Sequence, residues 1–241
     1  MFRTGNPALR GDVFTQERAS ESAGVMTIQG TVNKTFVLLL ITVITASWIW
    51  ADPLVRMPLV IPAAIIGLIV AIITVFNKSK SGITAPIYAA VEGIVVGGIS
   101  AFFEKQYPGI VMQAVALTFG TLFCLLAVYK SRLIKVTENF KLGVVAATGA
   151  VCLIYFVSII MGFFGARIPF IHDSGPIGIG FSLVVVCIAA INLVLDFDFI
   201  ENGAAAGAPK YMEWYGAFGL VVTLIWLYLE MLRLLSKLRS R

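Results

Sequence analysis

Five acidic residues interrupt stretches of sequence that are otherwise almost wholly apolar. They are Glu92, Asp196, Asp198, Glu213 and Glu230. A carboxylate in hydrocarbon costs roughly 2.5–3.5 kcal/mol even on lenient insertion scales, so each acid needs a compensating interaction. No lysine or arginine stands in the middle of these stretches, which leaves protonation or a bound cation as the compensation. The chemistry that we expect is therefore proton exchange and cation binding.

The composition indicates that lipid surrounds most of the chain. Of the 241 residues 59% are hydrophobic and 13% are charged, and the mean hydropathy is +0.94. A soluble domain could not bury so much apolar surface. Apolar runs of about 20 residues satisfy their backbone hydrogen bonds in a bilayer as helices, which excludes a β-barrel. The runs predict seven spans, near residues 34–51, 57–76, 84–103, 109–129, 142–164, 177–200 and 211–235.

Short connections join these spans, so we expect an all-α integral membrane protein with one seven-helix bundle over residues 34–238. A polar tail, residues 1–33, precedes it. Basic residues gather before the first span and in the connections after spans 2 and 4, which predicts a cytoplasmic N-terminus by the positive-inside rule. Seven spans then place the C-terminus outside, against the preference of its own basic residues, Arg233, Lys237, Arg239 and Arg241.

Several functional classes are disfavoured. The formal charge of +5 comes from residues spread among the connections rather than from a basic and aromatic stripe, so we expect no nucleic-acid partner. Cys124, Cys152 and Cys187 lie inside apolar runs without metal-site spacing and are expected to be buried free thiols. The motifs of metalloproteases, serine hydrolases and intramembrane aspartyl proteases are not found in the sequence. We expect neither an enzyme nor a cofactor.

The five acids lie at different depths along their predicted spans. Glu92 is eight residues into its span, about 12 Å at the helical rise. Asp196 and Asp198 lie in the last turns of span 6, and Glu213 lies in the first turn of span 7. With a cytoplasmic N-terminus these four acids share the cytoplasmic half of the membrane. Glu230 lies 17 residues beyond Glu213, about 25 Å along a straight helix. Depth therefore favours Glu213 as the neighbour of Asp196.

Helical geometry separates Asp196 from Asp198, because residues two apart point about 200° away from each other. Asn192 lies one turn before Asp196 on the same face, so we expect Asp196 to point inward with Asn192 as a supporting polar group. Glu213 is followed on its own face by Gly216, a small residue that permits close packing against span 6. An acid pair between spans 6 and 7 is therefore reasonable.

Each acid also has an explanation without transport. Asp198 and Glu213 lie close enough to span ends to be solvated among headgroups, and Glu92 is placed for a buried structural hydrogen bond. Glu230 precedes Arg233 by three residues, the spacing of a surface ion pair.

Glycines indicate that the third span is an interior helix. Gly93 and Gly97 have the GxxxG spacing that lets a neighbouring helix approach closely.

Two stretches resemble the Bax inhibitor-1 family, also called the transmembrane Bax inhibitor motif family. Residues 192–201 (NLVLDFDFIE) are similar to the apolar-Asp-Thr-x-x-Ile ending of the family's span 6, and residues 227–235 (LYLEMLRLL) are similar to its Leu-Tyr-Leu-Asp segment in span 7. Residues 92–97 (EGIVVG) resemble the corresponding helix. The chain departs from the pattern where Asp, instead of Thr, follows Phe197, where the second acid is Glu, and where the two acids are further apart.

The resemblance implies a seven-helix bundle of Bax inhibitor-1 type that acts as a proton-sensitive cation leak. A carboxylate pair from spans 6 and 7 would share a proton when the leak is closed and separate when ionised. Carried over by motif, the pair is Asp196 and Glu230, whereas depth points to Asp196 and Glu213. Calcium, which accepts oxygen ligands, would be the transported ion and would bind at Asp196, Glu213 or Glu230. The similarity to bacterial members implies the bacterial inner membrane.

We therefore predict a pH-sensitive, calcium-permeable channel or leak. Its acids, Glu92, Asp196, Asp198, Glu213 and Glu230, would act as proton and cation sites. One alternative is a regulator that transports nothing and binds other membrane proteins, such as a membrane protease, through its tail and helix surfaces. Another is a proton-coupled transporter of a small solute. In each case membrane lipid surrounds the bundle.

Overall fold

The computed structural model describes residues 24–165 and 173–240. Within them it confirms the all-α prediction, with seven helices long and apolar enough to cross a membrane. Residues 1–23 of the expected tail and Arg241 lie outside the described residues. The long helices are α2 (Ile28–Ala51), α4 (Val60–Phe76), α5 (Ser81–Gln106), α6 (Ile110–Lys130), α7 (Glu138–Phe163), α9 (Pro176–Ala205) and α10 (Met212–Arg239), and the short ones are α3 (Pro53–Arg56), η2 (Met57–Leu59) and η3 (Lys78–Lys80).

The first span begins earlier than the hydropathy indicates. Thr27 has an extended backbone and its side chain accepts a hydrogen bond from the Gly30 amide at 2.9 Å, which makes it the N-cap of α2. The helix therefore starts at Ile28, six residues before the predicted boundary at residue 34. As a result, Lys34 lies in the second turn of a spanning helix and not in the tail.

The sixth span ends later than expected. Helix α9 continues through Glu201, whose carboxylate has partners outside the helix, to Ala205, and it stops before Gly207, whose φ of +67° favours glycine. Asp196 is therefore nine residues before the end of α9, about 13 Å at the helical rise. The predicted end of this span at residue 200 falls five residues short of the helix end, so Asp196 lies between two and three turns from that end and not in the final turn.

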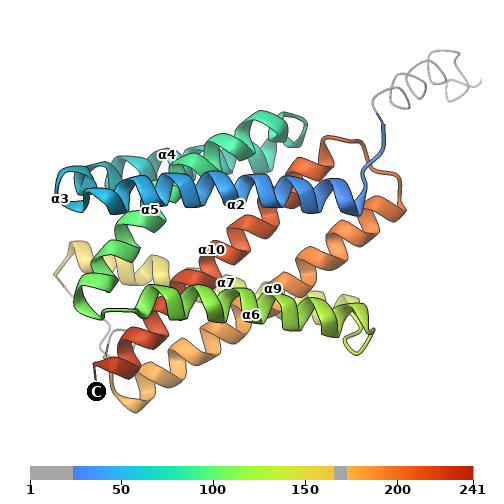
Figure 1. The fold of residues 1–241 in the computed structure, drawn as a ribbon. Helices are drawn as coiled ribbons and strands as arrows, with labels where there is room; N and C mark the ends of the chain where they lie inside the picture. Colours follow the sequence, from blue (N-terminus) through green and yellow to red (C-terminus); the bar gives the residue numbers. More distant parts are fainter. Residues whose placement is uncertain (1–23, 166–172, 241) are drawn as a thin grey trace, which may run out of the picture.

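Helix α10 is the centre of the bundle. It packs against α2, α5, α6 and α9, and in Figure 1 it crosses obliquely between α2 and α6. Its side chains from Ala217 to Leu232 supply much of the buried core. By contrast, α7 contacts mainly α9 and turns most of its surface outward. Residues on α10 are thus placed to meet groups from several other helices.

The third span lies against the first through its glycines. A Cβ at Gly97 would be 2.6 Å from the Ala46 carbonyl oxygen of α2, and a Cβ at Gly93 would be 2.5 Å from the Thr42 carbonyl oxygen. Only glycine permits this backbone separation. The contact fixes α2 on α5 and leaves the opposite side of α2 facing outward.

The cysteines correct one expectation. Cys124, Cys152 and Cys187 are free, as predicted, but all three lie on exposed helix faces. In a membrane protein an apolar run does not mean burial in protein, because lipid covers the outer faces.

Candidate functional site

A cavity of about 880 Å³ lies between α4, α7, α9 and α10. Its lining includes Lys141 of α7 and Thr223 of α10. Its wall on α9 carries Asn192, Asp196 and Asp198, all predicted site residues, so the structure gathers three of them in one place. Small residues make room for it, since Gly219 of α10 faces the Asp196 carboxylate.

Asp196 is the unusual member of this cavity. Its Oδ2 atom is buried and has no hydrogen-bond partner among the described residues. Thr223 of α10 lines the same cavity, and its hydroxyl donates a hydrogen bond to the Gly219 carbonyl at 3.2 Å. A buried polar atom without a partner is rare and costly, so it indicates a proton or a bound ligand at this carboxylate. The expectation that Asp196 points inward agrees with this position.

Asn192 lies one turn from Asp196 and joins α9 to α7. Its amide nitrogen donates hydrogen bonds to the Thr148 hydroxyl and to the Ile188 carbonyl, both at 2.8 Å. The amide oxygen of Asn192 has no part in these bonds and remains an acceptor for a proton donor or a cation.

Asp198 points to another helix, as its 200° separation from Asp196 predicts. Lys141 of α7 is 3.1 Å from its carboxylate, and the Asp198 side chain is 17% exposed. One turn later, Glu201 pairs with Arg132 at 2.9 Å and accepts a hydrogen bond from Tyr129. Two acids of α9 are therefore neutralised by basic groups of the α6–α7 region.

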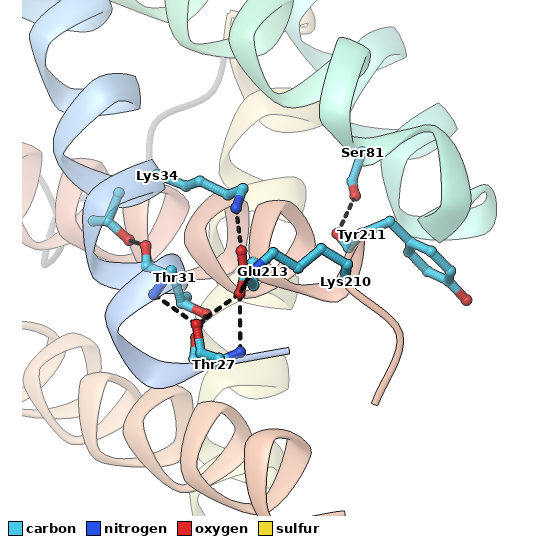
Figure 2. A network of polar contacts seen from close by, with 9 residues as sticks. Thr27, Thr31, Lys34, Ser81, Lys210, Tyr211 and Glu213 are labelled. Carbon is cyan, nitrogen blue, oxygen red and sulfur yellow. Dashed lines mark hydrogen bonds and ion pairs between the residues drawn. The ribbon is translucent and has the colours of Figure 1, made fainter. Parts of the chain in front are cut away.

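Glu213 lies in a separate network at the start of α10, shown in Figure 2. Its carboxylate is fully buried and contacts two lysines, Lys34 of α2 and Lys210 at 2.7 Å. It also accepts hydrogen bonds from the Thr27 amide at 2.9 Å and the Thr27 hydroxyl at 2.8 Å. The carboxylate lies so close to Gly30 that a Cβ there would overlap it. Glu213 is thus an ionised carboxylate that links α2 to α10 through ion pairs and hydrogen bonds.

The segment before α2 adds backbone contacts with the connection between α9 and α10. Val25 forms an isolated antiparallel bridge with Pro209, and the Met26 amide donates to the Ala208 carbonyl at 2.7 Å. The Met26 side chain is 2% exposed and its sulfur lies against Gly203 of α9. Residues 24–27, which we call the strap, therefore hold the α9–α10 connection to the start of α2.

Glu230 is buried near the opposite end of α10. Its carboxylate accepts hydrogen bonds from Arg233 at 2.9 and 3.2 Å and from the Tyr155 hydroxyl of α7 at 2.9 and 3.1 Å. The ion pair with Arg233 exists as its spacing suggests, but it is not a surface pair, because Glu230 is only 2% exposed.

Glu92 faces α4. One carboxylate oxygen is 3.0 Å from the position that a Cβ at Gly67 would occupy, and the residue is half-buried. The described residues provide no ion pair or hydrogen bond to its side chain. Glu92 therefore resembles Asp196 in lacking a basic partner, and the structural hydrogen bond considered from sequence is not formed within the described part of the chain.

The structure brings neither proposed partner to Asp196. Thr223 and Gly219 of α10 line the cavity with Asp196. Thr223 is seven residues from Glu230, about 10 Å at the helical rise, and Gly219 is six residues from Glu213, about 9 Å. No group of three or more acidic, histidine or cysteine side chains that could hold a metal ion occurs among the described residues. A cation at Asp196 would meet neutral oxygen ligands beside this carboxylate, because Asp198 of the same cavity is paired with Lys141.

Sequence reasoning missed the cationic partners. Lys34, Lys141 and Lys210 lie at or next to the predicted ends of spans, yet each contacts an acid of a span. Thr223 was also missed, although its position seven residues before Glu230 places both on one stripe of α10.

Comparison with known families agrees with this arrangement of helices. A family model described as Bax inhibitor 1 like matches residues 6–240, nearly the whole chain. A comparison with curated proteins finds no match. Because the family match covers all seven spans and the segments that carry the acids, the chain belongs to the Bax inhibitor 1 like family.

Proposed function

We propose that this protein is a pH-regulated cation leak that passes calcium, with Asp196 as its proton switch and first cation-binding group. The observation that carries the proposal is the unpartnered Oδ2 of Asp196, buried in a cavity of about 880 Å³. A carboxylate kept there without a basic partner is a functional candidate, because evolution can satisfy a purely structural acid with a lysine or a hydrogen bond.

Polar side chains continue from this cavity along the contact of α7, α9 and α10, which we call the polar seam. On α10, Thr223, Glu230 and Lys237 follow one another at intervals of seven residues, or about 10 Å. On α7, Thr148 and Tyr155 have the same interval. Each faces a polar group on another helix: Thr148 contacts Asn192, Tyr155 contacts Glu230, and Lys237 donates to Ser182 at 2.8 Å.

The polar seam supports transport because it supplies oxygen and amide groups at several depths of an otherwise apolar bundle. The number of ligands at each depth is small, so an ion would be bound weakly. Weak binding suits conduction, because the ion must be released again. Calcium accepts such mixed ligands of carboxylate, amide and hydroxyl oxygens. Asp196, Asn192 and Thr223 provide one of each kind at the cavity.

The direction of the pH effect follows from charge. When Asp196 carries its proton, the cavity has no uncompensated negative charge and attracts no cation. When Asp196 ionises, a buried carboxylate without a basic partner attracts one. Flux is therefore expected to rise with pH. In this proposal one acid acts as the switch, and Glu213 and Glu230, which have their own basic partners, are not its proton-sharing partners.

We further propose that the N-terminus faces the cytoplasm of a bacterial cell and that the chain resides in the inner membrane. At the end of the bundle where α2 begins, the structure places Lys34, Lys78, Lys80, Arg132, Lys141 and Lys210. In and beside the connections between spans, this end carries Lys78, Lys80, Lys130, Arg132, Lys135 and Lys210, whereas the described connections of the opposite end carry Arg56 and Lys105. Such a difference in the number of basic residues favours this orientation.

The test is calcium entry into proteoliposomes that contain the purified protein and an internal calcium dye. Wild type is expected to show flux that rises from acidic to alkaline pH, and Asp196→Asn is expected to remove both the flux and its pH dependence. Glu138→Gln is the matched control, because Glu138 is an exposed acid that also contacts Lys141 but does not line the cavity.

Other outcomes distinguish the remaining functions. Flux in Asp196→Asn equal to that of wild type would refute the role of Asp196. Absence of any calcium flux, together with capture of a membrane protein that depends on residues 1–33, would favour the regulator. Uptake that saturates with a small solute and requires a proton gradient would favour the transporter.

A further inference from the structure

We infer that a second cavity, between α2, α5, α6 and α10, is a binding site for one acyl chain of a membrane lipid. Its volume is about 580 Å³, and its lining is almost wholly apolar. This volume lies within the range of ligand pockets, roughly 300–1,000 Å³. The cavity shares no lining residue with the cavity of Asp196, so the inference goes beyond the proposed leak and does not depend on ion flux.

The cavity opens toward the bilayer between two spanning helices, α2 and α6, both of which pack against α10. Among its lining residues are Val43 of α2, which is 58% exposed, and Phe119 of α6, which is 37% exposed. Both lie well inside their spans, where the surroundings are hydrocarbon. A molecule already dissolved in the lipid can therefore enter from the side, whereas a solute from water must first cross hydrocarbon.

The length of the cavity matches one leaflet of a membrane. On α2 its lining runs from Leu39 to Ala51, a distance of about 18 Å at the helical rise. Half of the hydrocarbon core of a bilayer is about 15 Å thick. Trp50 lines the end of the cavity near the end of α2, and tryptophan is enriched at the level of the headgroups. A chain that lies along α2 therefore has its headgroup beside Trp50 and its methyl end beside Leu39.

The buried hydroxyl groups of the cavity already have partners within the protein. Ser100 of α5 and Tyr228 of α10 form a hydrogen bond with each other at 2.6 Å. Thr42 and Thr118 each donate to a carbonyl of their own helix, at 3.0 and 2.8 Å. A site for a polar solute offers its ligand precisely placed polar groups that remain available. Hydrocarbon needs no such group and leaves none of these hydroxyls unpaired, so the lining favours an acyl chain.

The test is light-activated labelling from inside the bilayer. The full-length protein is placed in vesicles of phosphatidylcholine that carries a diazirine at the end of one acyl chain, and mass spectrometry of peptides locates the adducts. Adducts are expected on Leu224 and Ile225 of α10, which line the cavity and are 3% and 7% exposed. Lipid on the outer surface of the bundle does not reach these two residues, so such adducts require a chain inside the cavity.

Val115→Phe fills the cavity from α6. It is expected to lower the yield of α10 adducts by about ten-fold, because a chain forced into filled space meets the cost of an overpacked core. Leu117→Phe is the matched control, since Leu117 lies on the same helix, is 45% exposed and does not line the cavity. Its adduct yield should equal that of wild type. Val43→Trp, at an exposed position of the lining, narrows the opening and replaces Val115→Phe if that variant does not fold.

Two results would overturn the acyl-chain site. One is labelling of the wild type that is confined to exposed residues. The other is an equal yield of α10 adducts in wild type, Val115→Phe and Val43→Trp. A native mass spectrum that shows a dimer without retained lipid would assign the opening to a second copy of the chain and would also refute the inference. None of these measurements uses calcium flux, so failure of the leak and failure of the lipid site are separate outcomes.

Discussion

The Glu213 network offers a direct test of how charged groups hold the bundle together. Glu213→Ala removes a fully buried carboxylate and strands the Thr27 amide and hydroxyl together with two ammonium groups. A hydrogen bond to a charged group contributes about 1.5–3 kcal/mol, and because Thr27 is exposed and regains water, the two bonds together contribute about 2–3 kcal/mol. The lysine contacts add about 1 kcal/mol, because the side chains of Lys34 and Lys210 are 19% and 47% exposed and regain water. The expected loss of stability is therefore about 3–4 kcal/mol.

A loss of this size is measurable as thermal unfolding in detergent. For a chain of this length 1 kcal/mol corresponds to roughly 2–4 °C, so Tm should fall by roughly 6–16 °C. Glu138→Ala is the control, because Glu138 forms the same kind of contact with a lysine three residues away, at 3.2 Å, but is 85% exposed. It should shift Tm by less than about 2 °C. Equal shifts in the two variants would show that burial of Glu213 adds nothing.

Three further variants test other parts of the structure. Met26→Ala should lower stability by about 2–3 kcal/mol in the same melting assay, because it empties a buried position beside Gly203, whereas the exposed neighbour Ile28→Ala should not. Gly97→Val should destabilise the bundle by about 1–3 kcal/mol, since its Cβ would meet the Ala46 carbonyl; unchanged melting would show that α2 can move away from α5. Asn192→Leu should reduce calcium flux with little change in Tm, and wild-type flux in this variant would remove Asn192 from the path.

The number and type of the helices could be predicted because lipid imposes a simple rule. A run of about 20 apolar residues must be helical in hydrocarbon, and nothing in the tertiary structure can change that. The ends of the helices were less predictable. Helix α2 extends back past Lys34, and α9 extends forward past Glu201, because each of these charged residues is paired with a group on another helix. Hydropathy treats a charge as the end of a span and cannot register a partner that is distant in sequence.

The acid pair carried over from the family motif shows a second limit. A motif gives the position of an acid along a helix but not the depth or rotation at which two helices pack. Glycines and alanines set both, and in this fold they place Thr223 rather than an acid opposite Asp196. The depth of Glu230 along its span and the longer stretch between Asp196 and Glu230 were the features of the sequence that indicated such an offset.

The absence of lysine and arginine from the middle of the spans led to the expectation that all five acids would depend on protons or cations. That inference was wrong for three of them. Lysine and arginine have long side chains, and those at helix ends reach inward to Asp198, Glu213 and Glu230. Among the described residues Asp196 and Glu92 have no basic partner, so of the five acids only these two still require a proton or a bound cation. If transport depends on protonation, Glu92→Gln and Asp196→Asn are therefore the acid-to-amide substitutions that should change the pH dependence of flux, and Asp198→Asn should not.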